Sequence, residues 1–303
     1  VTVLYSLADT LFVGMMNDQI QNAAVALAAP ALLAFNAVIN LFGIGSSSMM
    51  SRALGRGDLK TVCASASLGF YGTVVSGALL SALCYIFMQP FVVLRGGDIN
   101  TAAATTAYMN WAVVCGAIPT ILNVVMGYMV RAEGASLHAS IGTMSGCILN
   151  MILDPFFILP WGLGMGAAGA GLATFLSNCF ACCYFFVLLR VRKKKTNINL
   201  NPKYLSLTKE IVFGVMEVGI PAAIQNLLNV TGMTILNNFV AGYGSSAVAA
   251  VGIAQKVYMV PIQVALGGTQ GVMPLVGYSY ASKNKQRFEE TIQTVMKLLV
   301  PCM

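Results

Sequence analysis

Long apolar runs alternate with short polar segments along almost the whole chain. Seven runs exceed the ~20 residues that an α-helix needs to cross the hydrocarbon core of a bilayer. A shorter run lies at each end, so we expect nine helices in an all-α polytopic membrane protein. The runs lack the two-residue alternation that is typical of membrane-spanning strands. The predicted helices cover residues 1–16, 23–51, 61–94, 101–130, 136–160, 166–190, 210–240, 246–281 and 289–303.

The composition supports this class of protein. Hydrophobic residues make up 57% of the 303 residues and charged residues only 9%, with a mean hydropathy of +0.78. Soluble proteins carry about 25% charged residues, so a soluble enzyme is excluded, and disorder would need low hydrophobicity. The eight Cys lie mostly in apolar runs and His138 is the only His. Metal and redox chemistry at thiols or imidazoles is therefore disfavoured.

The positive charges indicate topology rather than nucleic-acid binding. Fourteen of the 17 Lys and Arg residues lie in alternate connections between apolar runs, which is the positive-inside pattern. It places the connection at 190–209 in the cytoplasm and those at 17–22, 160–165 and 241–246 outside. We therefore expect a multi-pass protein of the cytoplasmic membrane. Both ends of the chain lie in apolar runs, so we expect a piece of a longer protein.

The basic connection also predicts a domain boundary. We expect an N-terminal six-helix lobe at 1–189 with a truncated first helix, a cytoplasmic linker at 190–209 and the start of a second lobe at 210–303. A weak repeat supports this division. The segment Ala24–Ala26 aligns with Ala247–Ala249 and Gly45 with Gly268 at a constant offset of 223, and Asp58 aligns with Asn284 after a three-residue gap. Parallel repeats are typical of transporters, although Ala- and Gly-rich helices also converge by chance.

Burying a charged residue inside a membrane span costs free energy, so the charged residues that do occur there usually have a function. Asp9 and Asp154 lie within apolar runs. Asn150 precedes Asp154 by four residues and so shares its helix face, and Pro155 leaves a backbone carbonyl without its helical partner. These oxygens suit a small cation or a shared proton. The alternative is that Asp154 caps a kinked helix and Asp9 lines a watery crevice.

Two further charged residues remain without an assigned role. Glu217 lies near the start of its helix, where it can reach the interface. Lys256 can extend its ammonium group to the membrane surface or pair with an acid. A role for the basic linker in binding anionic lipid is less favoured than a purely topological one.

Several motifs together resemble the multidrug and toxic compound extrusion (MATE) transporters. The resemblance covers the whole chain and implies twelve helices in two six-helix lobes, of which this chain would hold roughly helices 1–9. It implies a monomeric antiporter that exports organic, often cationic, compounds in exchange for Na⁺ or H⁺, without another cofactor. The motifs are YSLADTLFVG, SRALGRGD, RAEG (131–134), LNMILDPFFI, GAAGAGLATFLSN, GIPAAIQNLLN and QGVMPLVGYSYAS.

The resemblance also implies functional residues. The family's cation site falls on Asp9, Asn150, Asp154 and Thr174, with Na⁺ as one candidate ion, and Tyr5 matches a cavity tyrosine. Some members use a glutamate in the middle of helix 7. Gln225, Asn226 and Asn229 occupy that stretch here, so we assign Gln225 and Asn229 to the substrate cavity and place the cation site in the N-terminal lobe. Membrane lipids are the other expected partners, and nucleic acid is not.

Three other functions were weighed. A flippase for lipid-linked precursors belongs to the same broad superfamily, but it predicts a strongly basic cavity. An intramembrane metal-dependent phosphotransferase would need several acids clustered at one interface, so we expect no enzyme and no catalytic residues. A structural or receptor-like membrane protein would explain neither the paired acids nor the repeat.

Overall fold

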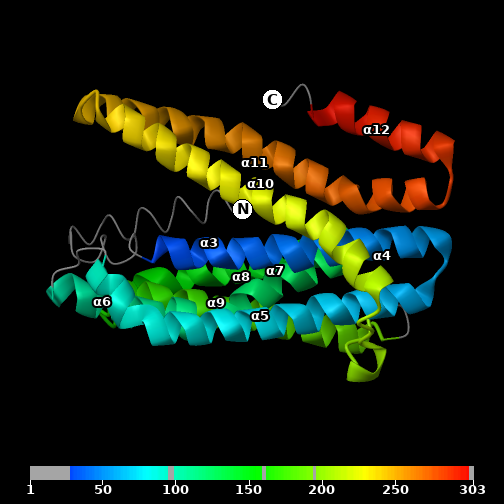
Figure 1. Cartoon of the computed structure of the whole chain (residues 1–303), viewed down its shortest axis with the longest axis horizontal. Helices are drawn as coiled ribbons and strands as arrows, with labels where there is room; N and C mark the ends of the chain where they lie inside the picture. The colour runs from blue at the N-terminus through cyan, green and yellow to red at the C-terminus, as the bar shows by residue number, and fades with distance from the viewer. Residues whose placement is uncertain (1–27, 95–98, 159–161, 194–195, 300–303) are drawn as a thin grey trace.

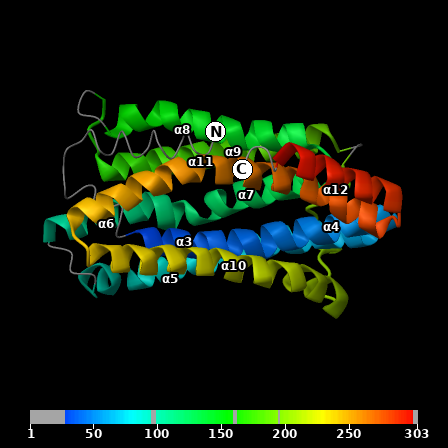
Figure 2. The same ribbon diagram turned by 90° about the horizontal axis from the view of Figure 1, so that it is seen from above.

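A computed structural model describes residues 28–94, 99–158, 162–193 and 196–299, and these ranges form helices joined by turns and one extended linker (Figure 1). Figures 1 and 2 show the long helices running roughly along one common axis. The elements are α3 (Ala29–Val38), η1 (Ile39–Ile44), α4 (Gly45–Arg56), α5 (Leu59–Leu94), α6 (Ile99–Met109), η2 (Asn110–Cys115), α7 (Ala117–Ala132), α8 (Ser136–Ile158), α9 (Ala167–Val191), η3 (Pro202–Tyr204), α10 (Lys209–Ala241), α11 (Ser245–Ala281) and α12 (Lys285–Leu299).

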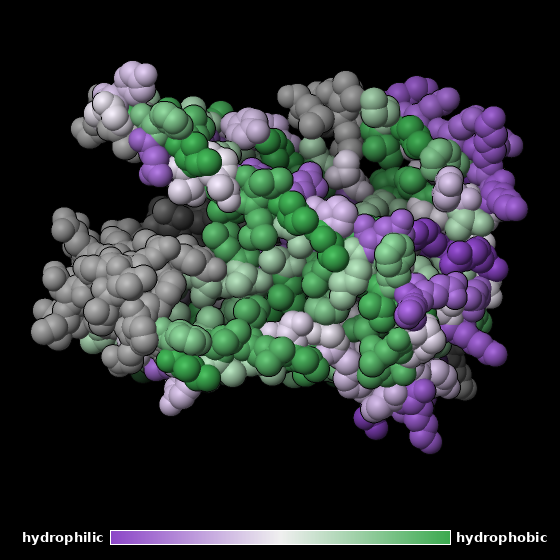
Figure 3. Space-filling model, in the orientation of Figure 1, coloured by the Kyte–Doolittle hydropathy of each residue, from purple (hydrophilic) through white to green (hydrophobic). Residues whose placement is uncertain are grey.

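The helices match the predicted membrane spans. Six of them are long and apolar enough to cross a bilayer, and the pair 103–115 and 117–132, bent by 45° near Gly116, makes a seventh. The second predicted span is the continuous unit α3–η1–α4, in which η1 is a π-helical segment. The first predicted span lies outside the described residues. Green apolar surface covers the middle of the molecule in Figure 3 and hydrophilic residues gather at one end, as expected of a membrane protein.

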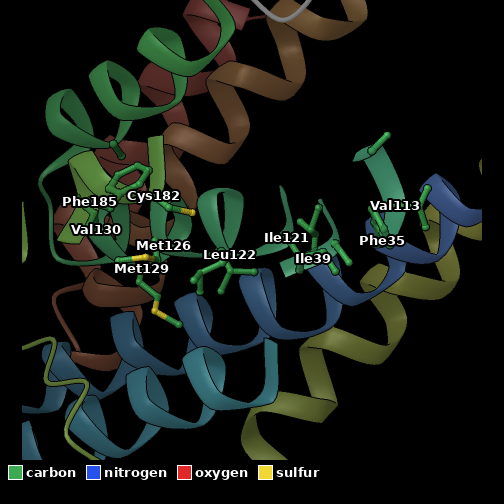
Figure 4. Close-up of a cluster of buried hydrophobic side chains, with 14 of the residues drawn as sticks. Phe35, Ile39, Val113, Ile121, Leu122, Met126, Met129, Val130, Cys182 and Phe185 are labelled. Atoms are coloured by element: carbon green, nitrogen blue, oxygen red, sulfur yellow. The ribbon is translucent and has the colours of Figure 1, made fainter. Parts of the chain in front are cut away.

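Helix α7 lies at the centre of the bundle formed by α3–α9. Its side chains Ile121, Met126 and Met129 are almost completely buried. Figure 4 shows them between Phe35 of α3 and Phe185 of α9. This core holds the neighbouring α8 and α9 in fixed positions against one another.

The hydrophilic end of the molecule, here called the basic end, holds the turns after α4, α7 and α11 and the linker between α9 and α10. The turns after α4 and α11 have the same construction. Gly57 (φ +76°) and Lys283 (φ +56°) are left-handed, and the next residue caps the following helix. Asp58 accepts a hydrogen bond from the Thr61 N–H at 3.2 Å, and Asn284 accepts one from the Arg287 N–H at 3.0 Å. The two residues aligned by the sequence repeat therefore have equivalent places.

Helices α4 and α11 meet through residues that the repeat also makes equivalent. A Cβ atom built on Gly277 would lie 3.3 Å from the Ser51 Cβ, and one on Gly55 would lie 2.9 Å from the Ala281 Cβ. Each pair is separated by the same number of residues as Asp58 and Asn284. An element that touches its own equivalent lies on the axis relating the two copies. Gly55 is needed there, because its Cβ would lie 2.4 Å from the Tyr278 carbonyl oxygen.

The linker after α9 is fixed along one face of α5. The side chains Cys63, Ser67 and Tyr71, spaced four residues apart, donate to the carbonyl oxygens of Asn197, Asn199 and Leu200 at 3.1, 2.8 and 2.8 Å. This segment is therefore an ordered strap across the basic end. The division of the chain into lobes at 190–209 stays a prediction.

Glu133, at the end of α7, holds the start of the same strap. Its carboxylate accepts hydrogen bonds from the Thr196 hydroxyl and the Asn197 N–H, both at 2.5 Å. Burial raises the pKa of Glu133 above its usual value, while these two donors and Arg192 lower it in part. The net shift means that the folded protein binds a proton here more readily than the unfolded chain does.

This pKa shift predicts a pH-dependent stability. Between the usual value of 4.5 and the raised pKa, the folded state holds more protons, so stability falls as pH rises through that window. Glu133→Gln removes the titration. We expect the thermal unfolding midpoint of the wild type, relative to this variant, to decrease from pH 4.5 towards neutrality. Parallel midpoint profiles for the two proteins would contradict the assignment.

The contact between α4 and α11 predicts a specific cross-link. In a protein whose native cysteines have been replaced, Ser51→Cys with Gly277→Cys should form a disulfide under mild oxidation, because the Cβ separation approaches the ~3.5–4.5 Å of natural disulfides. Protease cleavage in the linker followed by electrophoresis would detect it. The matched control is Met49→Cys with Gly277→Cys, because Met49 faces Gly214 of α10 instead. Equal yields from the two pairs would refute the contact.

Candidate functional site

A cavity of about 350 Å³ lies inside the α3–α9 bundle. Helices α3, α7, α8 and α9 contribute most of its walls, and both π-helical segments reach it, η1 through Ile39 and η2 through Ala112. Its lining is apolar with hydroxyl and amide groups. The lining residues are Leu32, Phe35, Asn36, Ile39, Tyr108, Ala112, Thr120, Asn123, Thr143, Gly146, Cys147, Asn150, Ala170, Thr174, Ser177 and Asn178.

Helix α8 turns one narrow stripe towards this interior. Its buried residues recur every four positions from Gly142 through Gly146, Asn150 and Asp154 to Ile158. The small residues in this stripe let α9 come close, so that a Cβ atom on Gly146 would lie 3.1 Å from the Ala181 Cβ. The stripe delivers the amide of Asn150 and the carboxyl group of Asp154 to the α8–α9 contact. Their side chains are 2% and 0% exposed.

Asn150 connects Asp154 to α9. With the amide oriented to match its neighbours, its nitrogen donates to Asp154 Oδ2 at 3.0 Å and its oxygen accepts from the Thr174 N–H at 3.2 Å. The structure therefore brings together three of the four residues predicted to form a cation site. Asp154 lies one helical turn beyond the cavity wall, which Asn150 and Thr174 themselves line. Asp9 and Tyr5 lie outside the described residues.

A second group of polar side chains continues this network, and the sequence analysis missed it. Asn123 of α7 donates to Asn178 Oδ1 of α9 at 3.1 Å. Asn178 donates in turn to Thr120 Oγ1 at 3.1 Å and to the Thr174 carbonyl oxygen at 2.9 Å. The Asn123 Oδ1 atom is buried and meets no partner among the described residues. Amides inside apolar runs were the available signal, but neither Asn123 nor Asn178 has a neighbouring charge in the sequence to mark it.

The other predicted site residues lie elsewhere. Gln225 and Asn229 are exposed on α10 and are not among the residues lining this cavity. Glu217 is also exposed on α10, near the basic end. The side chain of Lys256 lies outside the described part of the structure. The substrate-cavity role of Gln225 and Asn229 stays a prediction.

Among the described residues, this site combines neutral hydroxyl and amide oxygens with the carboxyl group of Asp154. No Lys, Arg or His is among the described residues that line the cavity. In the same part of the chain, no group of three or more His, Cys, Asp or Glu side chains could hold a metal ion. Hydroxyl, amide and carboxylate oxygens are the kind of ligands that hard cations prefer.

A bundle of membrane-spanning helices around an internal cavity is compatible with a membrane transport protein, and comparison with known proteins identifies the family. A family model described as MatE matches residues 1–156 and 221–303. The chain belongs to the MatE family, whose members are transporters and not enzymes.

Individual relatives agree with this assignment. The chain is 31% identical over 300 residues to the multidrug export protein MepA of Staphylococcus saprophyticus subsp. saprophyticus, and covers 65% of that protein. It is 30% identical over 307 residues to MepA of Staphylococcus aureus, covering 66%. All but 1% of this chain aligns in the first comparison and all of it in the second. The chain therefore spans about two thirds of these relatives, which agrees with the expected truncation.

Solved structures show the same fold. The crystal structure of a MATE P26A mutant superposes with a TM-score of 0.92 at 25% identity, over 98% of this chain and 66% of that one. A multidrug resistance MATE family transporter of the MOP superfamily, described as outward-facing, superposes with a TM-score of 0.87 at 26% identity, over 98% and 65%. The predicted two-lobe, MATE-like helical architecture is confirmed at the level of fold.

The amide network predicts a loss of stability on mutation. Asn178→Ala would leave Thr120 and Asn123 without their shared partner, at a cost of about 1–2 kcal/mol in unfolding free energy. The thermal unfolding midpoint of the purified protein in detergent should fall accordingly. Asn229→Ala, which changes an exposed amide on α10, is the matched control. Equal midpoints for both variants would show that the network does not hold α7 and α9 together.

Proposed function

We propose that this chain belongs to a cation-coupled antiporter that exports organic, often cationic, compounds across the cytoplasmic membrane. The observation that carries the proposal is the buried carboxyl group of Asp154, joined to α9 through Asn150. Asp9 and Thr174 complete the proposed cation site. Relatives named multidrug export proteins support two parts of this proposal, namely that transport runs outward and that the substrates are small molecules.

Burial narrows the candidate coupling ions. Burial disfavours the charged form of a carboxyl group, so a proton or a bound cation stabilises it there. Asn150 and Thr174 add neutral amide and hydroxyl oxygens as candidate cation ligands. Na⁺ and H⁺ are therefore the two candidates, and occupancy by either changes the charge beside the cavity.

The cavity walls suit an organic cation. Phe35 and Tyr108 supply aromatic surface, which attracts cations, and the amides supply hydrogen bonds that fix orientation. A flippase for diphosphate-bearing lipids would need a basic cavity, and the described residues that line this one include no Lys or Arg. The geometry therefore favours the drug antiporter over the flippase.

The arrangement of helices supports alternating access. By the positive-inside pattern we assign the basic end to the cytoplasm. There, α4 packs closely against α11, which closes that side. Alternating access then requires the α4–α11 contact to separate during transport.

The proposal predicts that Asp154 is essential for coupled transport. In the intact transporter in proteoliposomes, Asp154→Asn should reduce gradient-driven efflux of a fluorescent organic cation by at least about tenfold, because the amide neither binds a proton nor neutralises Na⁺. Na⁺ and pH gradients, imposed separately, would identify the coupling ion. Asp9→Asn should behave in the same way.

Glu210→Gln is the matched control, because it removes an exposed carboxylate at the start of α10 and should leave efflux unchanged. Protein amount and monodispersity must be equal in all variants. Efflux at the wild-type rate in Asp154→Asn would remove Asp154 from the coupling mechanism. Loss of efflux in Glu210→Gln as well would show that the assay reports folding rather than coupling.

A further inference from the structure

A second cavity, of about 690 Å³, lies at the basic end between α4 and the α11–α12 turn. It is separate from the cavity inside the α3–α9 bundle and shares no lining residue with it. Both copies of the repeat contribute to its walls. Its lining residues are Arg52, Arg56, Ser279, Tyr280, Ala281, Lys283, Asn284, Lys285, Phe288 and Glu289.

Positive charge dominates this cavity. Four basic side chains face one carboxylate, that of Glu289. Glu289 lies 3.8 Å from Lys285, but the two side chains are 55% and 87% exposed, so solvent screens their attraction. Arg52 donates to the Gly214 carbonyl oxygen at 3.1 Å and keeps further N–H groups for a ligand. The site therefore attracts an anion.

Two neutral features at the same place favour an anion too. Ser279 is completely buried, and in the part of the chain that the structure describes its hydroxyl group meets no hydrogen-bond partner. A buried donor without a partner is costly, and a ligand oxygen would satisfy it. The first turn of α12 also opens here at Lys285, and the N-terminus of a helix stabilises negative charge.

An aromatic pair borders the basic groups. The rings of Tyr280 and Phe288 lie 6.1 Å apart, and Tyr280 is 71% exposed. Aromatic side chains of this kind gather where membrane-spanning helices reach the lipid headgroups. Figure 3 shows hydrophilic residues gathered at this end of the molecule, next to its apolar middle. The cavity thus combines cations for a phosphate with apolar surface for the hydrocarbon attached to it.

We propose that this cavity binds the phosphate-bearing headgroup of an anionic phospholipid. Arg52 and Arg56 hold the phosphate from α4, Lys283 and Lys285 hold it from the α11–α12 turn, and the Ser279 hydroxyl donates to it. The start of the acyl chains lies against Tyr280 and Phe288. Because the headgroup joins the two repeat copies where α4 meets α11, binding stabilises the closed form of the basic end.

The test is direct binding by the purified intact transporter in neutral detergent. Short-chain phosphatidylglycerol is titrated, and bound lipid is counted by native mass spectrometry alongside the thermal unfolding midpoint. Arg56→Gln with Lys283→Gln should raise the dissociation constant about 10- to 30-fold, since each basic residue contributes appreciably to anionic-lipid binding. Ser279→Ala should raise it about three- to tenfold.

Matched controls distinguish a site from general charge. Lys193→Gln with Lys203→Gln removes two exposed charges that do not line the cavity. This variant should change the dissociation constant less than about threefold, because solvent and mobile ions screen exposed charges that do not contact the ligand. Short-chain phosphatidylcholine has a phosphate but no net negative charge, so it tests whether the net charge of the lipid is needed. Inorganic phosphate has no acyl chains, so it tests whether the cavity binds a soluble anion instead of a lipid. We expect both to bind more weakly than phosphatidylglycerol.

Equal affinity in the cavity variant and the linker variant would overturn the proposal. So would equal binding of phosphatidylcholine, or saturation by inorganic phosphate alone at concentrations where phosphatidylglycerol also saturates. If the double variant Arg56→Gln with Lys283→Gln does not fold, the dissociation constants of two single variants, Ser279→Ala and Arg56→Gln, provide the test instead. The measurement requires no transport, so its failure would leave the proposed antiport function untouched.

Discussion

The carboxyl group of Asp154 is buried in a helix whose opposite side is exposed on the apolar surface, at Ile148, Ile152 and Phe156. A membrane offers no water to solvate such a group, so the surrounding protein must do so. This requirement explains much of the local structure. The small residues along one stripe of α8 allow α9 to approach, and the amide of Asn150 then spans the two helices. The core around α7 fixes α9 on its other side.

The same constraint extends the polar groups beyond Asp154. The amides of Asn123 and Asn178 line the internal cavity, and the hydrogen bond between them avoids the cost of leaving these donor and acceptor atoms unpaired. The Thr174 backbone connects this network with Asn150, because its carbonyl oxygen accepts from Asn178 and its N–H donates to Asn150. A continuous set of hydrogen bonds thus runs from Asp154 on α8 through α9 to Asn123 on α7.

The helices and the pairing of Asn150 with Asp154 could be predicted, because the length of a span and the four-residue spacing on a helix are local properties of the sequence. The equivalence of Asp58 and Asn284 could be predicted from the alignment of the two repeat copies, and the structure shows that both residues cap a helix. The amide network could not be predicted by looking for charges. The strap on α5 depends on backbone carbonyls that any sequence would supply, and the π-helical segments have no residue signature. These features arise from tertiary contacts.

One continuous stretch of chain connects the internal cavity with the basic end. Ile39 begins the π-helical segment η1 and lines the cavity, and the same helix continues into α4, where Ser51 and Gly55 meet α11. A helix transmits displacement along its axis because its backbone hydrogen bonds resist stretching, and π-helical segments are frequent at functional sites. A movement of the cavity wall at η1 that propagates along this helix would reach the α4–α11 contact, which borders the basic cavity through Arg56 and Ala281. Under the proposed function, this helix is the structural element that could link occupancy of the interior with closure of the basic end.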